Sequence, residues 1–466
     1  MKSTLNDTLA KQKQAFLNNS YPSYKERKSN LIKLKRMLLD NQDVLIDAIS
    51  DDFGHRSKDD SRIGDFLSTV SGINYTLNKL KRWMKPERRH VGVLFQPATA
   101  RVEYQPKGVV GIMVPWNYPI FLALGPLTQA LAAGNRSMIK MSEYTPATSK
   151  LLKTLCQQYF DENLVSVIEG DASVAAAFSQ LKLDHIFFTG SINVGKLVMK
   201  AASKNLVPVT LELGGKSPCI IAPNMDIETA VNRLILGKVL NSGQTCVAPD
   251  YILCPKGQSE LLIKQLTKTY NSLYPSIKNN PDCTSVINEG QYDRINWLLN
   301  DAKVKGAKVT SLGIDESTPA CRQMPLTIVQ NTSEEMAISQ EEIFGPILPI
   351  VEYKTVEQAI SYINRGERPL ALYIYSFDKK IQRQILQNTH SGGVCINDAA
   401  MHVAIEDLPF GGVGHSGMGS YHGVEGFKTF SHAKSIFARG RLTLAQLLFP
   451  PFGTAIHKLI YKFFIR

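Results

Sequence analysis

The stretch HIFFTGSINVGKLVMKAASKNLVPVTLE, residues 185 to 212, decides the fold class. An apolar run at 185–190 is followed by a run of helical length and by a second, β-branched apolar run at 206–212. Strands of a parallel sheet are covered on both faces, so they are apolar throughout and alternate with helices. The stretch therefore predicts a strand, a helix and a second strand parallel to the first.

The same alternation recurs upstream. Strands are expected at VVGIMV, SMIKM and LVSVIEG (109–114, 137–141 and 164–170), with helices between them. Repeated units of this kind predict an α/β fold with a Rossmann-like, doubly wound parallel sheet, which binds ligands at the carboxyl ends of its strands. Residues 1 to about 86 carry apolar residues at helical spacing and are expected to form helices that pack on this body.

A second α/β region is expected downstream. Its strands are predicted at 251–254, 348–353, 371–376 and 392–397, and its helices at 258–273, 291–304, 356–365 and 379–388. Between the N-terminal helices and the first sheet, the run VGVLFQPATARVEYQP predicts a β-hairpin over about 91–106. The predicted division is a cofactor domain at 1–210, a catalytic domain at 211–397, a segment at 398–440 that returns to the cofactor side, and a tail at 441–466.

Composition excludes several classes of protein. Of 466 residues, 44% are hydrophobic and 20% are charged, as in ordinary soluble domains. The net charge of +12 is not gathered into a basic stripe with a nucleic-acid-binding module, so no nucleic-acid partner is expected. The N-terminus has no apolar signal segment, no stretch is apolar enough to span a membrane, and the seven cysteines include no C-x-x-C pair. A cytoplasmic enzyme without a metal site is the expectation.

Two residues carry the chemistry. Glu212 ends an apolar strand and precedes Gly214-Gly215, and Cys246 follows Gly243-Gln244-Thr245 in a turn. Cysteine is an intrinsically strong nucleophile, and a carboxylate can act as general base toward water. Together they are two halves of a covalent acyl-transfer site.

The strings around these residues, LELGGKSP and NSGQTCVA, resemble the two active-site signatures of the aldehyde dehydrogenase superfamily. The resemblance extends from about residue 10 to 440, and the local wording is most similar to the coniferyl aldehyde dehydrogenase branch. That branch is similar to the dimeric class 3 and fatty-aldehyde enzymes. The resemblance implies oxidation of an aldehyde to an acid, a homodimer, and a hairpin that helps to form it.

The resemblance also implies roles for residues. Cys246 is the expected nucleophile, Glu212 the expected base, and Asn117 in PWNYP (115–119) the expected donor to the oxyanion. The residues expected to bind the cofactor are Pro115, Trp116, Lys140, Glu143, Gly190, Ser191, Gly195, Leu213, Gly214, Glu342 and Phe344.

NAD is the expected cofactor, with NADP left open. In FTGSINVG, Ile192 stands where a dinucleotide-binding turn has its middle glycine, a departure that the aldehyde dehydrogenase family shares. Glu143 follows a strand where an adenosine ribose would lie, and a carboxylate there accepts from ribose hydroxyls and repels a 2′-phosphate. EEIFGP (341–346) supplies Glu342 and Phe344 to the nicotinamide ribose, by resemblance. The glycine-rich segment 409–423 is interpreted as a wall of the active site.

The tail, residues 442–466, is distinct. Its apolar residues from Phe452 to Phe464 follow helical spacing, with Lys458, Lys462 and Arg466 off that stripe. The expectation is that this helix caps the substrate funnel, and peripheral contact with a membrane surface is the alternative.

The predicted function is therefore NAD-dependent oxidation of an aldehyde, aromatic like coniferyl aldehyde or of medium to long aliphatic chain. A CoA-acylating dehydrogenase would use the same cysteine but would not need Glu212. A non-catalytic relative would be expected to lack Cys246, Glu212 or Asn117, and all three are present.

Overall fold

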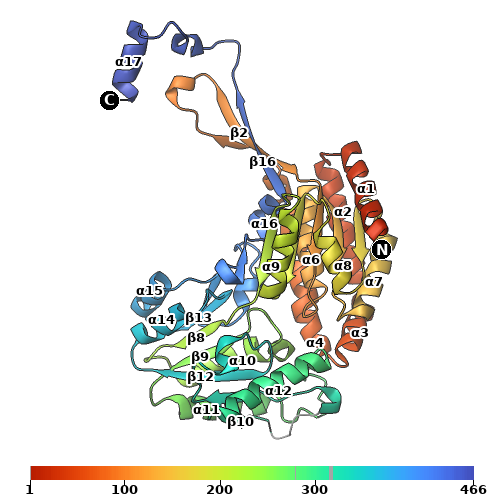
Figure 1. Cartoon of the computed structure of the whole chain (residues 1–466), viewed down its shortest axis with the longest axis vertical. Helices are drawn as coiled ribbons and strands as arrows, with labels where there is room; N and C mark the ends of the chain where they lie inside the picture. Colours follow the sequence, from red (N-terminus) through yellow and green to blue (C-terminus); the bar gives the residue numbers. More distant parts are fainter. Residues whose placement is uncertain (1, 279, 314–318, 466) are drawn as a thin grey trace.

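The structure, a computed structural model, describes residues 2–278, 280–313 and 319–465. Two sheets form the body, and a slender arm projects from it (Figure 1). The chain passes from the first sheet to the second between Leu213 and Pro218, and it returns to the first at residue 417.

The N-terminal region is helical, as the periodicity predicted. Its helices are α1 (Lys2–Asn18), α2 (Tyr24–Asp40), α3 (Gln42–Phe53), α4 (Lys58–Ser61) and α5 (Ser68–Trp83), with a π-helical turn at Arg62–Leu67. Ser23 caps α2 with a reciprocal pair of bonds to Glu26, which fixes where that helix begins.

The first sheet has six strands in the order β15-β7-β6-β3-β4-β5, all parallel except β15. The strands are β3 (Val109–Met113), β4 (Arg136–Lys140), β5 (Val165–Ile168), β6 (His185–Gly190), β7 (Val209–Leu213) and β15 (Gly417–Met418). Helices α6 (Phe121–Ala133), α7 (Pro146–Tyr159), α8 (Ala172–Ser179) and α9 (Ile192–Ser203) connect them. The predicted doubly wound parallel sheet is confirmed.

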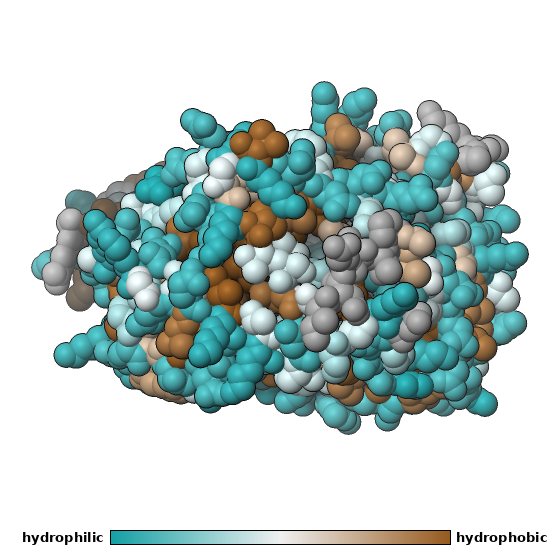
Figure 2. Space-filling view, turned by 90° about the horizontal axis from the view of Figure 1, so that it is seen from below, coloured by the Kyte–Doolittle hydropathy of each residue, from teal (hydrophilic) through white to brown (hydrophobic). Residues whose placement is uncertain are grey.

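The second sheet has seven strands in the order β10-β11-β12-β9-β8-β13-β14. They are β8 (Pro218–Ile221), β9 (Tyr251–Pro255), β10 (Lys308–Ser311), β11 (Thr327–Gln330), β12 (Ile347–Tyr353), β13 (Ala371–Tyr375) and β14 (Gly393–Ile396). Its helices are α10 (Ile227–Val239), α11 (Ser259–Leu273), α12 (Glu289–Val304), α13 (Ala337–Gln340), α14 (Val356–Arg365) and α15 (Lys379–Asn388). Figure 2 views the molecule from below, where this sheet lies, and hydrophobic side chains gather near the middle of that face.

The arm is a three-stranded antiparallel sheet of β1 (Glu87–Arg89), β2 (Thr99–Pro106) and β16 (Ser431–Ala438). The hairpin predicted over 91–106 therefore starts too late, because its first strand is Glu87–Arg89. That strand is entirely charged and mostly exposed, so it carries no apolar alternation. The helix α16 (Gly423–Thr429) leads the chain into β16.

The tail continues beyond the arm as a short 3-10 turn at Ala445–Leu448 and the helix α17 (Ala455–Phe464). Figure 1 shows α17 at the opposite end of the molecule from the seven-stranded sheet. The expected cap over the substrate funnel is therefore not formed within one chain, because β16 carries the tail away from the body.

Candidate active site

The strings PWNYP, LELGG and NSGQTC meet at one place. β3 and β7 are parallel strands separated only by β6, so Asn117, just past β3, and Glu212, in β7, lie at the same edge of the sheet. The side-chain amide of Asn117 donates to the backbone carbonyl of Gln244 at 3.1 Å, two residues before Cys246. The three predicted catalytic residues are thus brought together across 130 residues of sequence.

The turn before Cys246 is held in an uncommon backbone conformation. Asn241 and Ser242 have φ of 52° and 53°, and Gly243 has φ of 73°. The Gln244 side chain locks the turn, because it donates to two backbone carbonyls and accepts from the N–H of Ile287 at 3.0 Å. A preorganised loop therefore presents the partly exposed thiol.

Two carboxylates are close enough to the thiol of Cys246 to affect its ionisation. The pKa of Cys246 is raised to about 12. Burial is the largest cause, and the nearby carboxylates of Glu342 and Glu212 add to it. The protein without a bound cation therefore stabilises the thiol rather than the thiolate. Activation of the nucleophile requires a positive charge or the neutralisation of a carboxylate.

Glu212 is buried in β7, opposite Gly417 of β15. Neither carboxylate oxygen has a hydrogen-bond partner among the described residues. Burial raises the pKa of Glu212 well above its usual value. A carboxylate without partners next to a thiol is free to bind and deprotonate a water molecule. Because burying an unpaired carboxylate destabilises the folded protein, such a group indicates a functional role.

Sequence reasoning missed the support of Asn117. Arg56, from the loop after α3, donates to the backbone carbonyl of Asn117 at 2.7 Å and pairs with Asp65 at 3.3 Å, both side chains being fully buried. Asp65 in turn accepts from the N–H groups of Ile120 and Phe121 at 3.0 Å. The N-terminal helical region therefore holds the PWNYP turn from behind. No sequence signal pointed to this, because Arg56 and Asp65 lie 55 to 61 positions from the backbone groups that they contact and belong to no motif.

The EEIFGP segment forms the other side of the site. Phe344 packs edge-on against Trp116, with ring centroids 5.3 Å apart. Glu342 lies against Gly214, where any Cβ would collide with its carboxylate, and burial and Asp250 raise the pKa of Glu342 to about 8. All four residues were predicted to bind the cofactor, and the structure brings them into contact as two pairs, Glu342 with Gly214 and Phe344 with Trp116.

Three side chains that the sequence analysis did not name hold this segment. Lys216 pairs with Asp250 and donates to the carbonyls of Ile338 and Glu341, each at 2.8 Å. Asp250 also accepts from the N–H of Ile343 at 2.9 Å. Arg294 donates to the carbonyl of Glu342 at 3.2 Å.

The adenosine side of the predicted site lies along the same sheet edge. Lys140 ends β4, and its ammonium lies 4.0 Å from the carboxylate of Glu143, whose side chain is 38% exposed. Ser191 caps α9 by accepting from the N–H of Val194. Gly195 allows α9 to lie against Leu213, since a Cβ there would be 2.6 Å from Leu213 Cδ2. Gly190 ends β6, and Pro115 begins the turn after β3.

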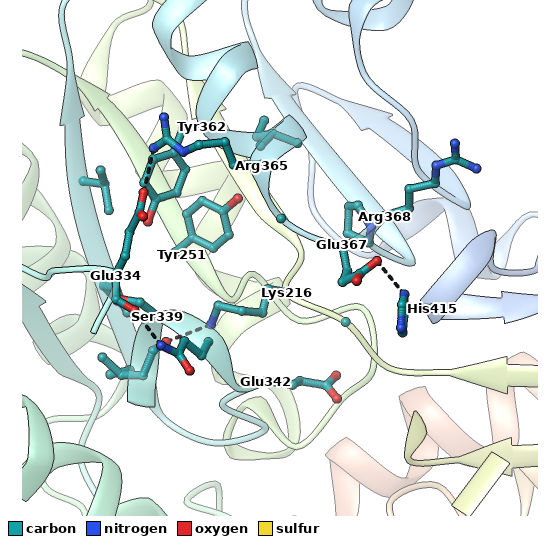
Figure 3. A pocket seen from close by; sticks show the side chains of 18 of the residues that line it. Lys216, Tyr251, Glu334, Ser339, Glu342, Tyr362, Arg365, Glu367, Arg368 and His415 are labelled. Atoms are coloured by element: carbon teal, nitrogen blue, oxygen red, sulfur yellow. Dashed lines mark hydrogen bonds and ion pairs between the residues drawn. The ribbon is translucent and has the colours of Figure 1, made fainter. Parts of the chain in front are cut away.

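A pocket of about 520 Å³ opens beside Glu342 and Gly214 (Figure 3). On the side of the seven-stranded sheet, its wall carries the ion pair of Arg365 with Glu334. Lys216, from the link between the sheets, also lines it, and Glu367 pairs there with His415, which precedes β15 of the first sheet. The near wall includes Ile192, at the start of α9. The pocket therefore lies between the two sheets, on the side where the predicted cofactor-binding residues are found.

The glycine-rich segment 409–423 borders the base. Burial raises the pKa of the Tyr421 phenol well above its usual value, and the nearby carboxylate of Glu212 raises it further. Gly412 and Gly417 touch backbone so closely that a Cβ on either would overlap it. This segment fits the interpretation as an active-site wall.

The chain was compared with known proteins. The model of the aldehyde dehydrogenase family matches residues 2–436. A probable coniferyl aldehyde dehydrogenase of Pseudomonas aeruginosa is 50% identical over 98% of this chain and 95% of its own, and a coniferyl aldehyde dehydrogenase of a Pseudomonas species is 43% identical over the same shares.

Solved structures agree. The substrate-bound state of Staphylococcus aureus AldH has a TM-score of 0.94 and 37% identity, and covers 99% of both chains. An aldehyde dehydrogenase of Mycobacterium tuberculosis complexed with NAD+ has a TM-score of 0.85 and 28% identity over 95% of this chain and 92% of that one. This chain belongs to the aldehyde dehydrogenase family, and it is an enzyme that oxidises aldehydes to carboxylic acids with a nicotinamide dinucleotide.

Proposed function

We propose that the protein oxidises a hydroxycinnamyl aldehyde of the coniferyl type, with NAD as cofactor. The observation that carries this proposal is the 50% identity, over 98% of the chain, to a protein named for that substrate. The aromatic surroundings of the base are consistent with it: Tyr421, Phe410 and His422 pack on one another beside Glu212. Flat aromatic walls suit a conjugated ring better than a flexible alkyl chain.

In the proposed mechanism, Cys246 attacks the aldehyde carbon as the deprotonated thiolate, the C=O π bond breaks, and the anion of a thiohemiacetal forms. The negative charge then develops on the former carbonyl oxygen. The Asn117 amide has two N–H groups, and one is used by Gln244. The second is free to donate to the oxyanion, and the bonds from Arg56 and Asn241 to the Asn117 backbone keep it aimed.

The second half-reaction belongs to Glu212. Loss of hydride from the thiohemiacetal leaves a thioester on Cys246, and water must then attack it. Glu212 takes a proton from this water, and its two unpartnered oxygens and raised pKa make it a stronger base than an exposed carboxylate. A CoA-acylating enzyme would not need a base buried at this cost.

The residues fit a dinucleotide. Glu342 and Glu143 offer carboxylates at the two ends of the sheet edge, where two ribose rings would each present hydroxyl groups. The absence of a Cβ at Gly214 leaves the carboxylate of Glu342 in place beside the thiol. Ser191 and the start of α9 provide N–H groups for a pyrophosphate. When bound, the nicotinamide accepts the hydride and adds positive charge near the thiol.

Preference for NAD over NADP is assigned to Glu143. Its carboxylate would repel a 2′-phosphate, and Lys140 is already paired with it. Replacing Glu143 with alanine should raise kcat/KM for NADP relative to NAD by about tenfold, the effect of removing one close repulsion. An unchanged ratio would assign the exclusion of the 2′-phosphate to other residues.

A homodimer and a cytoplasmic location complete the proposal. The arm supports the first, because it leaves apolar side chains largely exposed, among them Phe437 in β16 and Val93 in the turn before β2. The substrate assignment is tested with a panel of coniferyl, benzyl and long aliphatic aldehydes, measuring the acid product by chromatography. We expect the highest kcat/KM with coniferyl aldehyde, and a higher value with the aliphatic aldehydes would overturn it.

The nucleophile is tested in the same assay. Cys246→Ala should lower acid formation at least about a thousandfold, since removal of a covalent nucleophile leaves only binding effects. Cys321→Ala, which removes an exposed free thiol, is the matched control and should keep full activity. Turnover by the Cys246 variant would remove it from this role.

A further inference from the structure

The tail beyond the arm exposes apolar side chains that none of the described residues covers. It follows the end of β16 at Ala438 and lies outside the family match, which ends at residue 436. Large apolar side chains along it are exposed, among them Leu442 at 79%, Phe452 at 69% and Phe463 at 71%. A contiguous surface of this kind marks a site of interaction.

The helix α17 is amphipathic, and its apolar side faces outward. Ile456, Leu459, Ile460, Phe463 and Phe464 follow i, i+3, i+4, i+7, i+8 spacing and share one face. Four of the five are at least 43% exposed. The opposite face carries Lys458 and Lys462, and also His457, which is buried beside Phe452. The helix therefore contacts the rest of the tail through His457, and it leaves its apolar side exposed.

The charge of this region has one sign. Residues 426–466 contain seven Lys and Arg and no Asp or Glu: Lys428, Lys434, Arg439, Arg441, Lys458, Lys462 and Arg466. The partner of such a surface must carry negative charge. A second copy of the tail is disfavoured, since its cations would face these cations across a small interface.

The length of α17 determines whether it could span a bilayer or only lie on its surface. A ten-residue helix is about 15 Å long, and a bilayer core is about 30 Å thick. Among the residues that the structure describes, no helix is long and apolar enough to cross a membrane. A short helix with an aromatic apolar face and a basic opposite face instead lies flat in the headgroup region.

We propose that residues 442–465 bind the surface of an anionic lipid bilayer, with α17 parallel to the membrane plane. Phe463, Phe464, Leu459 and Ile456 enter the boundary between headgroups and acyl chains, and Lys458 and Lys462 contact anionic headgroups. The arm then acts as a spacer: Figure 1 shows it between the tail and both sheets, so the cofactor-side pocket remains in water.

Co-sedimentation with vesicles tests the proposal. The full chain, a chain ending at residue 441 and Phe463→Ser/Phe464→Ser are each mixed with phosphatidylglycerol–phosphatidylcholine vesicles and with pure phosphatidylcholine vesicles, at low and high sodium chloride. The full chain should bind the anionic vesicles at low salt, bind pure phosphatidylcholine at least about tenfold more weakly, and be released by high salt. The other two proteins should remain in the supernatant.

The charge contribution has a matched control. Lys458→Gln/Lys462→Gln should weaken binding about tenfold. Lys264→Gln/Lys268→Gln removes the same charge from α11, far from the arm, and should leave binding unchanged. Oxidation of a water-soluble aldehyde by each variant should equal that of the full chain.

Two results would overturn the proposal. One is no binding of the full chain to anionic vesicles at low salt. The other is equal binding by the chain that ends at 441. If, in either case, truncation changes the oligomeric state or the chain-length preference among aldehydes, the tail instead covers a second copy of the enzyme, as a cap over its substrate funnel.

Discussion

The carboxylates around Cys246 have different tasks, and single substitutions separate them. In Glu212→Gln the thioester should form but hydrolyse slowly, because only the second half-reaction needs this base. Rapid mixing should show a burst of NADH close to one per site and a steady rate at least about a hundredfold lower than normal. Glu289→Gln, an exposed carboxylate on α12, is the control. Loss of the burst itself would mean that Glu212 acts on the thiol.

Glu342 controls the thiol when no cofactor is bound. Its pKa of about 8 means that it is charged only above that pH, and its charge raises the pKa of Cys246. Glu342→Gln should therefore speed alkylation of Cys246 by iodoacetamide several-fold above pH 8 and leave it unchanged below. The measurement is the alkylation rate against pH, followed by mass spectrometry. Identical profiles for both proteins would contradict the coupling.

At the scale of elements, the buried pair Arg56–Asp65 joins the N-terminal helices to the PWNYP turn. Asp65→Asn should lower the free energy of unfolding by about 3–5 kcal/mol, because Arg56 keeps its charge without its partner. Urea unfolding measures this loss. The double variant Arg56→Met/Asp65→Leu should recover most of the stability but not kcat, since Asn117 then loses its hydrogen bond from Arg56. Full activity in the double variant would mean that the pair is only structural.

The sequence predicted the helices and strands whose hydrophobic pattern is strong. HIFFTG became β6 with its predicted bounds, because a strand covered on both faces is apolar along its whole length. In the second sheet the strands β8, β10 and β11 were missed, since each has only four residues and β10 is also largely polar and partly exposed. Site residues, too, could be predicted only where the local sequence carries a clear signal. Cys246 and Glu212 belong to recognisable strings, whereas Arg56, Asp65 and Arg294 act through contacts that only folding creates.

For the whole molecule, we expect a dimer formed through the arm. Light scattering should give twice 51.7 kDa for the full chain. Replacing residues 90–98 by a short Gly-Ser turn should shift the mass toward one chain, because that loop exposes Val93 and Phe95 at the end of the arm. Deleting 442–466 serves as the comparison. A dimer that persists without the loop would assign the interface to another surface.

The junction between the sheets has a consequence for recombining this enzyme with its relatives. Only four residues, 214–217, link β7 to β8, and they carry Gly214 against Glu342 and Lys216 against Asp250. In the sequence, the base Glu212 precedes this link and the thiol of Cys246 follows it. A chimera joined at 214–217 would combine Glu212 of one enzyme with the Cys246 loop of another. The contacting surfaces of the two halves would then come from different proteins and would not be matched to each other. Grafts that preserve turnover should instead exchange segments at the arm, where no reacting group crosses the splice.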